Sequence, residues 1–443
     1  MLRLRYDLAC PGTPPARTRS AHRTFHLLPA VPALALVALS LGVLGDPRAS
    51  AQPAVRNAGV IASASGETQT RFGPLTAADR DFLVKVRLAG LWEGPTGRQA
   101  QVRSGNPAVR QAGIHLVAGH AELDAKVLAI GNAFRVELPD KPNADQRAWM
   151  AEMTDANSSR QYDQIFVDRL RAAHGKVYGL VAQVRAGTRN SVIRTFSQRT
   201  MEVVLDHITM LERTGLVNWS ILPLPPSPVP GASPGTNMVQ TAHGPMTDSG
   251  RDFLRKVRLA GLWEGPSGRQ AQERAGSDAV RLAGQHLIDG HAELDATVLQ
   301  VGGELGVALP SEPNAAQQGW MAEMTNARTP QEYDRVFVSR LRAAHGAVYG
   351  LVAQIRAGTR NDLIRAFSQR TMEVVLDHIT MLERTGLVNF AALPPPPEPA
   401  PGGTGDGRQF SPMFVVSILA LAGALSYAAR VRFYRREAGP HRA

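Results

Sequence analysis

The chain has 443 residues, with 49 Lys and Arg against 38 Asp and Glu and a single Cys. Much of the formal net charge of +11 lies at the two ends of the chain. Residues 1–51 contain six Arg and two Asp, and residues 430–443 contain five Arg and one Glu, so each end has a net charge of +4. The 378 residues between them have a net charge of only +3. So small a charge argues against a nucleic-acid-binding surface. Because Cys10 precedes the first apolar run, disulfides and thiolate metal sites are excluded from the folded part.

Residues 1–51 have the pattern of a secretory signal peptide. Arginines up to Arg23 precede an apolar run, 27–45, and small residues follow as far as Ala51, near which we expect cleavage. An uncleaved signal anchor is the alternative. Residues 52–75 are mostly small and polar, so we expect them to be disordered.

The middle of the chain contains one unit twice, at residues 76–219 and 247–390. A constant offset of 171 aligns the copies, and 101 of the 138 positions from Asp81 to Asn218 are identical, with no gap. Such similarity predicts two domains with one shared fold. The Pro-rich linker 220–246 and the Pro/Gly-rich tether 391–409 are expected to be extended, and to hold the domains apart from each other and from the membrane.

Each copy has helical periodicity throughout. Apolar residues recur every three or four positions in 106–131, 158–187 and 190–214, and a short helix is expected at about 143–154. The first helix, about 76–102, contains Gly94-Pro95, which should interrupt and kink it. Gly187 is expected to follow a last turn in the left-handed conformation. We therefore predict an all-α fold, with two tandem antiparallel four-helix bundles of up-down topology.

A transmembrane helix is predicted near the end of the chain. Residues 410–429 carry no charge, and about 20 helical residues just span a hydrocarbon core of about 30 Å. The arginines of the tail 430–443 favour a cytoplasmic position for the C-terminus. The sequence thus predicts a single-pass protein, anchored in the cell membrane through its C-terminal helix, with an extracellular ectodomain.

Each main helix offers one polar side chain on or beside its apolar face. In order, these are Glu93, His120, His174 and His207, and in the second copy Glu264, His291, His345 and His378. If the four helices alternate in direction, these positions spread over about 10 Å along the bundle, which permits a shared site without requiring one. Asp124 lies one turn from His120 and is a candidate for orienting its ring. His115 and Arg194 are expected at the surface.

Three interpretations of these side chains stay open. We favour buried polar groups bonded to neighbours or to backbone carbonyls, with no cofactor. The second is a transition-metal or zinc site inside each bundle, and the third is acid–base catalysis, as in a hydrolase. A di-iron centre is disfavoured because Glu-x-x-His elements on two helices are absent from the sequence.

The unit resembles the bacterial "domain of unknown function 4142" family. The resemblance is carried by Asp81-Phe82-Leu83, Glu93, His120 with Glu122-Leu123, Leu138-Pro139, Tyr162-Asp163-x-x-Phe166, His174 and His207, over essentially the whole of both copies. It implies ferritin-like bundles in an exported protein, and the family carries no established activity. Gly119 and Gly290 stand where the family usually has Asp.

These observations lead to one functional hypothesis and one alternative. We expect a membrane-anchored envelope protein that binds an envelope protein or polymer without catalysis, since two tethered copies suit multivalent contact. The alternative is a metal-binding or oxidative-stress protein that uses the eight Glu and His residues named above. Nucleic acid is not expected as a partner.

Overall fold

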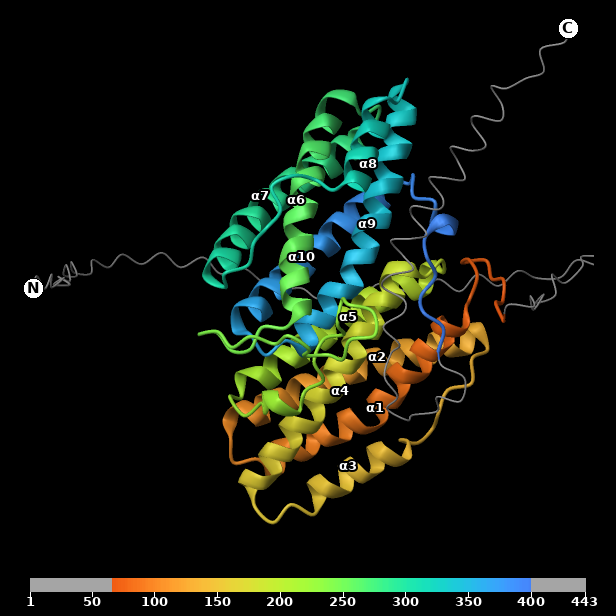
Figure 1. Cartoon of the computed structure of the whole chain (residues 1–443). Coiled ribbons are helices and arrows are strands. Elements are labelled where there is room, and N and C mark those ends of the chain that lie inside the picture. Colours follow the sequence, from red (N-terminus) through yellow and green to blue (C-terminus); the bar gives the residue numbers. More distant parts are fainter. Residues whose placement is uncertain (1–65, 400–443) are drawn as a thin grey trace, which may run out of the picture. The chain divides into compact units, whose positions relative to one another are not determined.

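The structure is a computed structural model that describes residues 66–399. This part of the chain contains ten α-helices, five in each copy (Figure 1). In the first copy these are α1 (Ala77–Arg103), α2 (Pro107–Phe134), α3 (Ala144–Thr154), α4 (Ser159–Gly187) and α5 (Ser191–Arg213). In the second copy they are α6 (Asp248–Arg274), α7 (Asp278–Glu304), α8 (Ala315–Thr325), α9 (Pro330–Gly358) and α10 (Asp362–Arg384). The all-α prediction and the two repeats are confirmed.

Polar residues cap the N-termini of the helices. Thr76 and Asp79 form a reciprocal capping box at α1, and Asn143 and Gln146 form another at α3. The Ser158 side chain accepts the Gln161 N–H at α4. These caps satisfy N–H groups that have no partner inside the helix.

The predicted interruption of the first helix is wrong. α1 runs continuously from Ala77 to Arg103 with Pro95 inside it. Proline in a helix interior costs about 3 kcal/mol. Here its neighbours Trp92 and Thr96 are buried, and we attribute the continuity of the helix to this packing on both sides of the proline.

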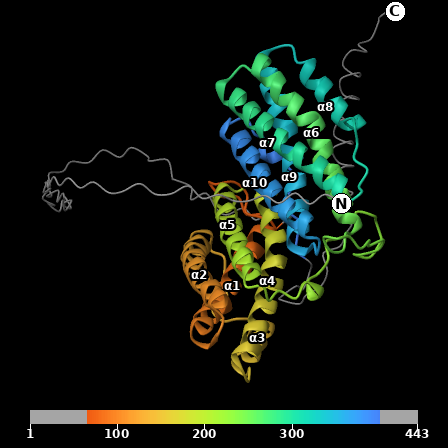
Figure 2. The ribbon, with the colours of Figure 1, turned by 90° about the vertical axis from the view of Figure 1, so that its left-hand side faces the viewer.

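Four helices of the first copy form a ring in which each neighbouring pair is antiparallel (Figures 1 and 2). α1 packs on α2, α2 on α5, α5 on α4 and α4 on α1. The Asn190 side chain donates to the Gly73 carbonyl at 3.1 Å, and this contact shows that the beginning of α1 lies beside the end of α4. Arg103 donates to the Ala156 carbonyl at 2.7 Å, and this contact shows that the end of α1 lies beside the start of α4.

Strict alternation of helix direction along the chain, which the sequence analysis assumed, is therefore wrong. α4 runs in the same direction as α2, because residues 135–158 carry the chain back along the length of the bundle. α3 forms part of this crossover and packs against α1 and α4. A single long crossover is the topology of ferritin-like bundles.

The two copies share buried contacts, so the prediction that the spacers hold them apart is wrong. One apolar cluster includes Tyr178 and Val181 of α4 together with Tyr349 and Val352 of α9.

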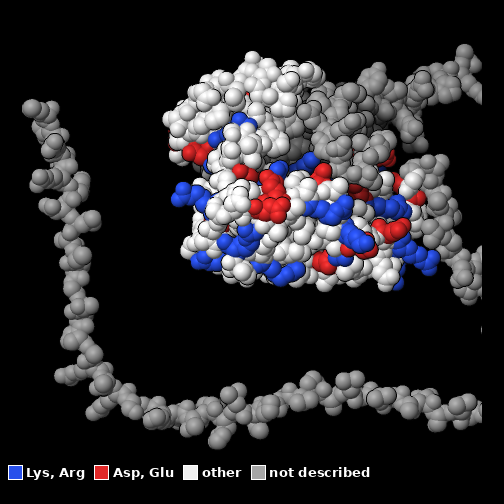
Figure 3. Space-filling model, turned by 90° about the horizontal axis from the view of Figure 1, so that it is seen from below, with Lys and Arg blue, Asp and Glu red and all other residues white. Residues whose placement is uncertain are grey.

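Trp92 and Trp149, whose ring centroids are 5.2 Å apart, belong to a separate core within the first copy. On the face shown in Figure 3, basic and acidic side chains are interspersed.

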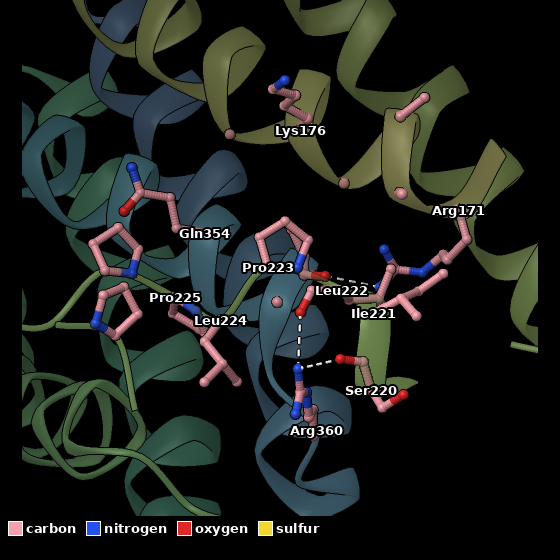
Figure 4. A pocket seen from close by; sticks show the side chains of 18 of the residues that line it. Arg171, Lys176, Ser220, Ile221, Leu222, Pro223, Leu224, Pro225, Gln354 and Arg360 are labelled. Atoms are coloured by element: carbon pink, nitrogen blue, oxygen red, sulfur yellow. Dashed lines mark hydrogen bonds between the residues drawn. The ribbon is translucent and has the colours of Figure 1, made fainter. Parts of the chain in front are cut away.

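The linker after the first copy contacts the second copy. Arg360 donates to the carbonyls of Ser220 and Leu222, at 2.6 and 3.1 Å (Figure 4). Together with α4 and the end of α9, this segment borders a cleft of about 1300 Å³ whose walls include Lys176 and Leu224. The proline-rich chain is thus a packing element as well as a spacer.

Several sequence-based predictions lie outside the described residues, namely the signal peptide 1–51, the transmembrane helix 410–429 and the basic tail 430–443. Within residues 66–399, no helix is long and apolar enough to cross a membrane. Residues 66–75, assigned by sequence to a disordered segment, form a turn in which Thr68 and Leu75 exchange backbone hydrogen bonds of 3.0 and 2.8 Å.

Candidate metal centre

The four polar side chains singled out in each copy meet inside the bundle. Glu93 comes from α1, His120 from α2, His174 from α4 and His207 from α5, and none is more than 4 % exposed. The three imidazoles each offer a nitrogen within 4.8 Å of the others. The equivalent residues Glu264, His291, His345 and His378 are buried to the same extent, and their imidazoles meet in the same way. Two histidine triads, one in each bundle, can therefore hold a metal ion.

The Glu93 carboxylate and the imidazoles are in direct contact. Glu93 Oε2 lies 2.7 Å from His120 Nε2 and 3.1 Å from His174 Nε2. His174 Nε2 in turn lies 3.0 Å from His207 Nδ1. In the second copy the corresponding separations are 2.9, 3.1 and 3.0 Å. Both bundles thus bring one carboxylate oxygen and three imidazole nitrogens together.

Backbone carbonyls determine which nitrogen carries the proton in two of the three rings. His174 Nδ1 lies 2.8 Å from the Leu170 carbonyl, and His207 Nε2 lies 3.0 Å from the His115 carbonyl. A carbonyl only accepts, so both of these nitrogens must donate. When the rings are neutral, His174 Nε2 and His207 Nδ1 each present a lone pair.

The consequence is a cluster of facing acceptors. The lone pair of His174 Nε2 faces Glu93 Oε2 at 3.1 Å and His207 Nδ1 at 3.0 Å, and no donor hydrogen lies in either contact when the rings are neutral. His120 Nε2 can donate to Glu93, which leaves the buried His120 Nδ1 without a partner. Buried acceptors in this arrangement need either an extra proton or a metal cation between them.

Burial and charge act in opposite directions on these groups. Burial alone would raise the pKa of Glu93, but the neighbouring imidazoles of His174 and His120, when protonated, and the hydrogen bond with His120 hold it below its usual range. Burial lowers the pKa of His174, although the Glu93 carboxylate opposes this shift. Burial also lowers the pKa of His207, to well below its usual range, and charge on His120 and His174 adds to the effect. A neutral His207, the form that binds metals, is thus favoured.

A small cavity adjoins the cluster. It has a volume of about 10 Å³ and borders Glu93, His120 and His174 on one side. Its other walls are mostly apolar and include Val86, Leu123 and Val204. Such a volume holds about one water molecule.

Two of the sequence-based expectations around the site need correction. Asp124 does not orient His120, because its carboxylate pairs with Arg87. Arg194 is not a surface residue, because its guanidinium lies over the Phe390 ring at 3.7 Å and its side chain is only 14 % exposed. His115 does lie outside the cluster, as expected, and its ring bonds Asp206 at 2.7 Å.

Sequence reasoning missed the role of Gly119. A Cβ at this position would lie 2.4 Å from His207 Nε2 and 2.7 Å from Val203 Cγ1, so only glycine leaves room for the imidazole. Gly290 has the same relation to His378. The available signal was the Gly-His pair that both copies contain, at residues 119–120 and 290–291.

A family model described as "Domain of unknown function (DUF4142)" matches residues 64–214 and again residues 235–385, together more than half of the chain. The chain belongs to the DUF4142 family. The resemblance inferred from the sequence motifs is confirmed, as are its two tandem copies. Searches of curated proteins and of solved structures find no match to this DUF4142 chain.

Proposed function

We propose that each DUF4142 bundle binds one divalent transition-metal ion, with zinc as the reference case. The ligands would be one Glu and three His in each copy, namely Glu93, His120, His174 and His207, and Glu264, His291, His345 and His378. Imidazole and carboxylate together suit zinc and neighbouring divalent ions. The observation that carries the proposal is the set of facing acceptors, because two backbone carbonyls leave the free nitrogen of His174 toward Glu93 and that of His207 toward His174.

The observed separations are compatible with such an ion. Two donor atoms about 2.1 Å from a metal lie about 3.0–3.4 Å apart for angles between 90° and the tetrahedral value. The contacts that Glu93 and His207 make with His174 measure 3.1 and 3.0 Å. These two pairs of donors therefore need to move by only a few tenths of an ångström, and the donor set, with one carboxylate, suits one ion per bundle rather than two.

Metal binding without turnover of a large substrate is the use that the surroundings favour. The ligands are nearly fully buried, and the adjoining cavity of about 10 Å³ has room for about one water molecule. A buried site lined by Val86 and Leu123 suits a tightly held ion. The metal-binding alternative from the sequence analysis is thus the function we put forward.

We also propose that the metal-binding bundles are displayed outside the cell membrane. The support is sequence pattern, namely the charged and apolar segments of residues 1–51 and the uncharged run 410–429 followed by arginines. Contact with an envelope protein or polymer belongs to this same sequence-based proposal.

Metal analysis of the purified full chain tests the metal proposal. We expect about two ions per chain after expression with zinc, and about one when His207→Ala removes the first site only. His115→Gln is the matched control, since its imidazole lies outside the cluster, and it should keep both ions. A wild-type content below about 0.1 ion per bundle would refute the proposal.

Labelling of intact cells with a membrane-impermeant maleimide tests the location. In a Cys10→Ser background, Ser233→Cys in the exposed linker should react, whereas Ala443→Cys in the tail should react only after lysis. Protection of the linker cysteine until lysis would contradict the proposed topology. The result is independent of metal content, so the two proposals can fail separately.

A further inference from the structure

The two copies are held together by reciprocal buried ion pairs. Arg185 of α4 makes two hydrogen bonds of 2.9 Å to the Glu383 carboxylate near the end of α10. Arg356 of α9 makes the same pair of contacts, 2.9 and 2.8 Å, to Glu212 near the end of α5. Both arginines are at most 2 % exposed. Bidentate geometry and burial make these contacts specific in orientation.

A second pair of arginines completes each carboxylate site. Arg171 Nε donates to Glu212 of its own copy at 2.9 Å, and its Nη2 donates to the Ala357 carbonyl of the other copy at 3.0 Å. Arg342 makes the equivalent contacts, 2.9 Å each, to Glu383 and the Ala186 carbonyl. Each glutamate is therefore bound by two arginines, one from its own copy and one from the other copy.

Aromatic rings and proline segments cross between the copies in the same reciprocal way. Arg365 lies over Trp219 at 3.9 Å, and Arg194 lies over Phe390 at 3.7 Å. A Cβ on Gly358 would be 2.5 Å from the Pro223 carbonyl oxygen, and one on Gly187 would be 2.6 Å from that of Pro394. Gly187 is thus the last residue of α4 rather than the predicted left-handed cap, and it is needed because the tether passes close to it.

Because the contacts are reciprocal, each copy carries both halves of the interface. The first copy contributes the donor Arg185 and the acceptor Glu212, and the second contributes Arg356 and Glu383. Over residues 171–190, which contain much of this surface, 18 of 20 positions are identical to 342–361. A surface that carries both halves is self-complementary, which is the condition for a two-fold symmetric pair of identical modules.

We propose that this surface also joins two separate chains, by pairing the first copy of one chain with the first copy of another. In such a pair, Arg185 of each chain would bind Glu212 of the other, and Trp219 would meet Arg194. In the wild type the linked second copy occupies the surface, because a short linker keeps its effective concentration in the millimolar range. The partner is therefore another molecule of the same chain, and it binds when the two repeat copies within one chain separate.

Two double variants that break the same number of ion pairs between the copies test the proposal. Both are made in the full chain and purified in a mild detergent. Arg356→Glu/Glu383→Gln breaks both ion pairs between the copies but leaves Arg185 and Glu212 intact in the first copy. Arg185→Glu/Arg356→Glu breaks the same two pairs and leaves neither copy with both halves. We measure molar mass by light scattering at about 100 µM, where complexes with a Kd of about 10 µM are mostly formed.

The first variant should double its mass to that of two chains, whereas the second variant and the wild type should remain single chains. A single-chain mass for the first variant with its helical circular dichroism retained would overturn the proposal, and so would equal doubling of both variants. If the first variant loses helix, Arg185→Glu/Glu212→Gln replaces it, since that change leaves the surface of the second copy intact.

Discussion

His174 Nε2 and His207 Nδ1 face each other at 3.0 Å, although the opposite nitrogen of each ring already donates to a backbone carbonyl. Two neutral imidazoles held in this way present lone pairs to each other. Glu93 adds a third acceptor 3.1 Å from His174. The arrangement lacks a donor, and this distinguishes the site from an ordinary set of buried histidines that satisfy one another.

Glu93→Gln tests the missing donor directly. The amide N–H₂ of Gln can donate to His174, so we expect the metal-free protein to keep its free energy of unfolding or gain up to about 1 kcal/mol. Metal content should fall from two ions per chain toward one, because the carboxylate ligand is lost only in the first copy. Urea unfolding in EDTA and metal analysis give the two readouts. A loss of several kcal/mol without metal would mean that the carboxylate instead binds a protonated imidazole.

Zinc should stabilise the protein against heat. A ligand that binds only the folded state, present at 100 times its Kd, adds about 2.7 kcal/mol per site. Addition of zinc to EDTA-treated protein should therefore raise the Tm by several degrees. His174→Ala/His345→Ala should abolish the increase, whereas His115→Gln/His286→Gln should preserve it. An equal increase in both double variants would place the zinc elsewhere.

Gly119→Ala should damage the first site without removing a ligand. The added Cβ would lie 2.4 Å from His207 Nε2, so the imidazole must leave its present position in the cluster. We expect a loss of about 1–3 kcal/mol in stability, as for other overpacked cores, and loss of one metal ion per chain. Gly303→Ala in α7 is the control, because its Cβ would meet nothing within 4 Å. That change should stabilise the helix by about 0.5–1 kcal/mol and leave the metal content unchanged.

The sequence identified the four site residues but not their convergence, and the reason is the path of the chain. With helices that alternate in direction, the four positions spread over about 10 Å along the bundle. In the structure, α4 runs parallel to α2. Counted at 1.5 Å per residue from the observed helix ends that lie beside the start of α1, the four site positions fall within about 5 Å of one another. Helical periodicity predicts which face a residue lies on, but not the direction of a helix that follows a long crossover.

The contact between the copies was hidden for a different reason. Arg194 lies outside the apolar stripe of its helix, which is typical of a solvated residue, and proline-rich segments usually act as spacers. In the structure, charged residues form the interface: Arg185 and Arg356 are buried because the other copy supplies the carboxylates. Amphipathic patterns detect apolar surfaces, whereas a surface of paired charges has no such periodicity.

Acid should weaken this interface, because its glutamates must be protonated. Burial alone would raise the pKa of Glu212, but Arg356 and Arg171 hold it below the ordinary value of 4.5, and Arg185 and Arg342 do the same for Glu383. A carboxyl group whose pKa is lower in the folded state contributes stability that is present above pH 4.5 and is lost as the pH falls through its folded-state pKa. The free energy of unfolding of the wild type should therefore fall as the pH is lowered from about 4.5.

Glu212→Gln/Glu383→Gln should lower stability near neutral pH and make this dependence shallower, because two of the titrating carboxyl groups are gone. Glu202→Gln/Glu373→Gln is the control, since these glutamates pair with arginines at the surface, and each is about 45 % exposed. The control should retain most of the wild-type slope in urea titrations at successive pH values. Equal slopes in the wild type and the Glu212/Glu383 variant would show that the buried pairs do not govern the acid response.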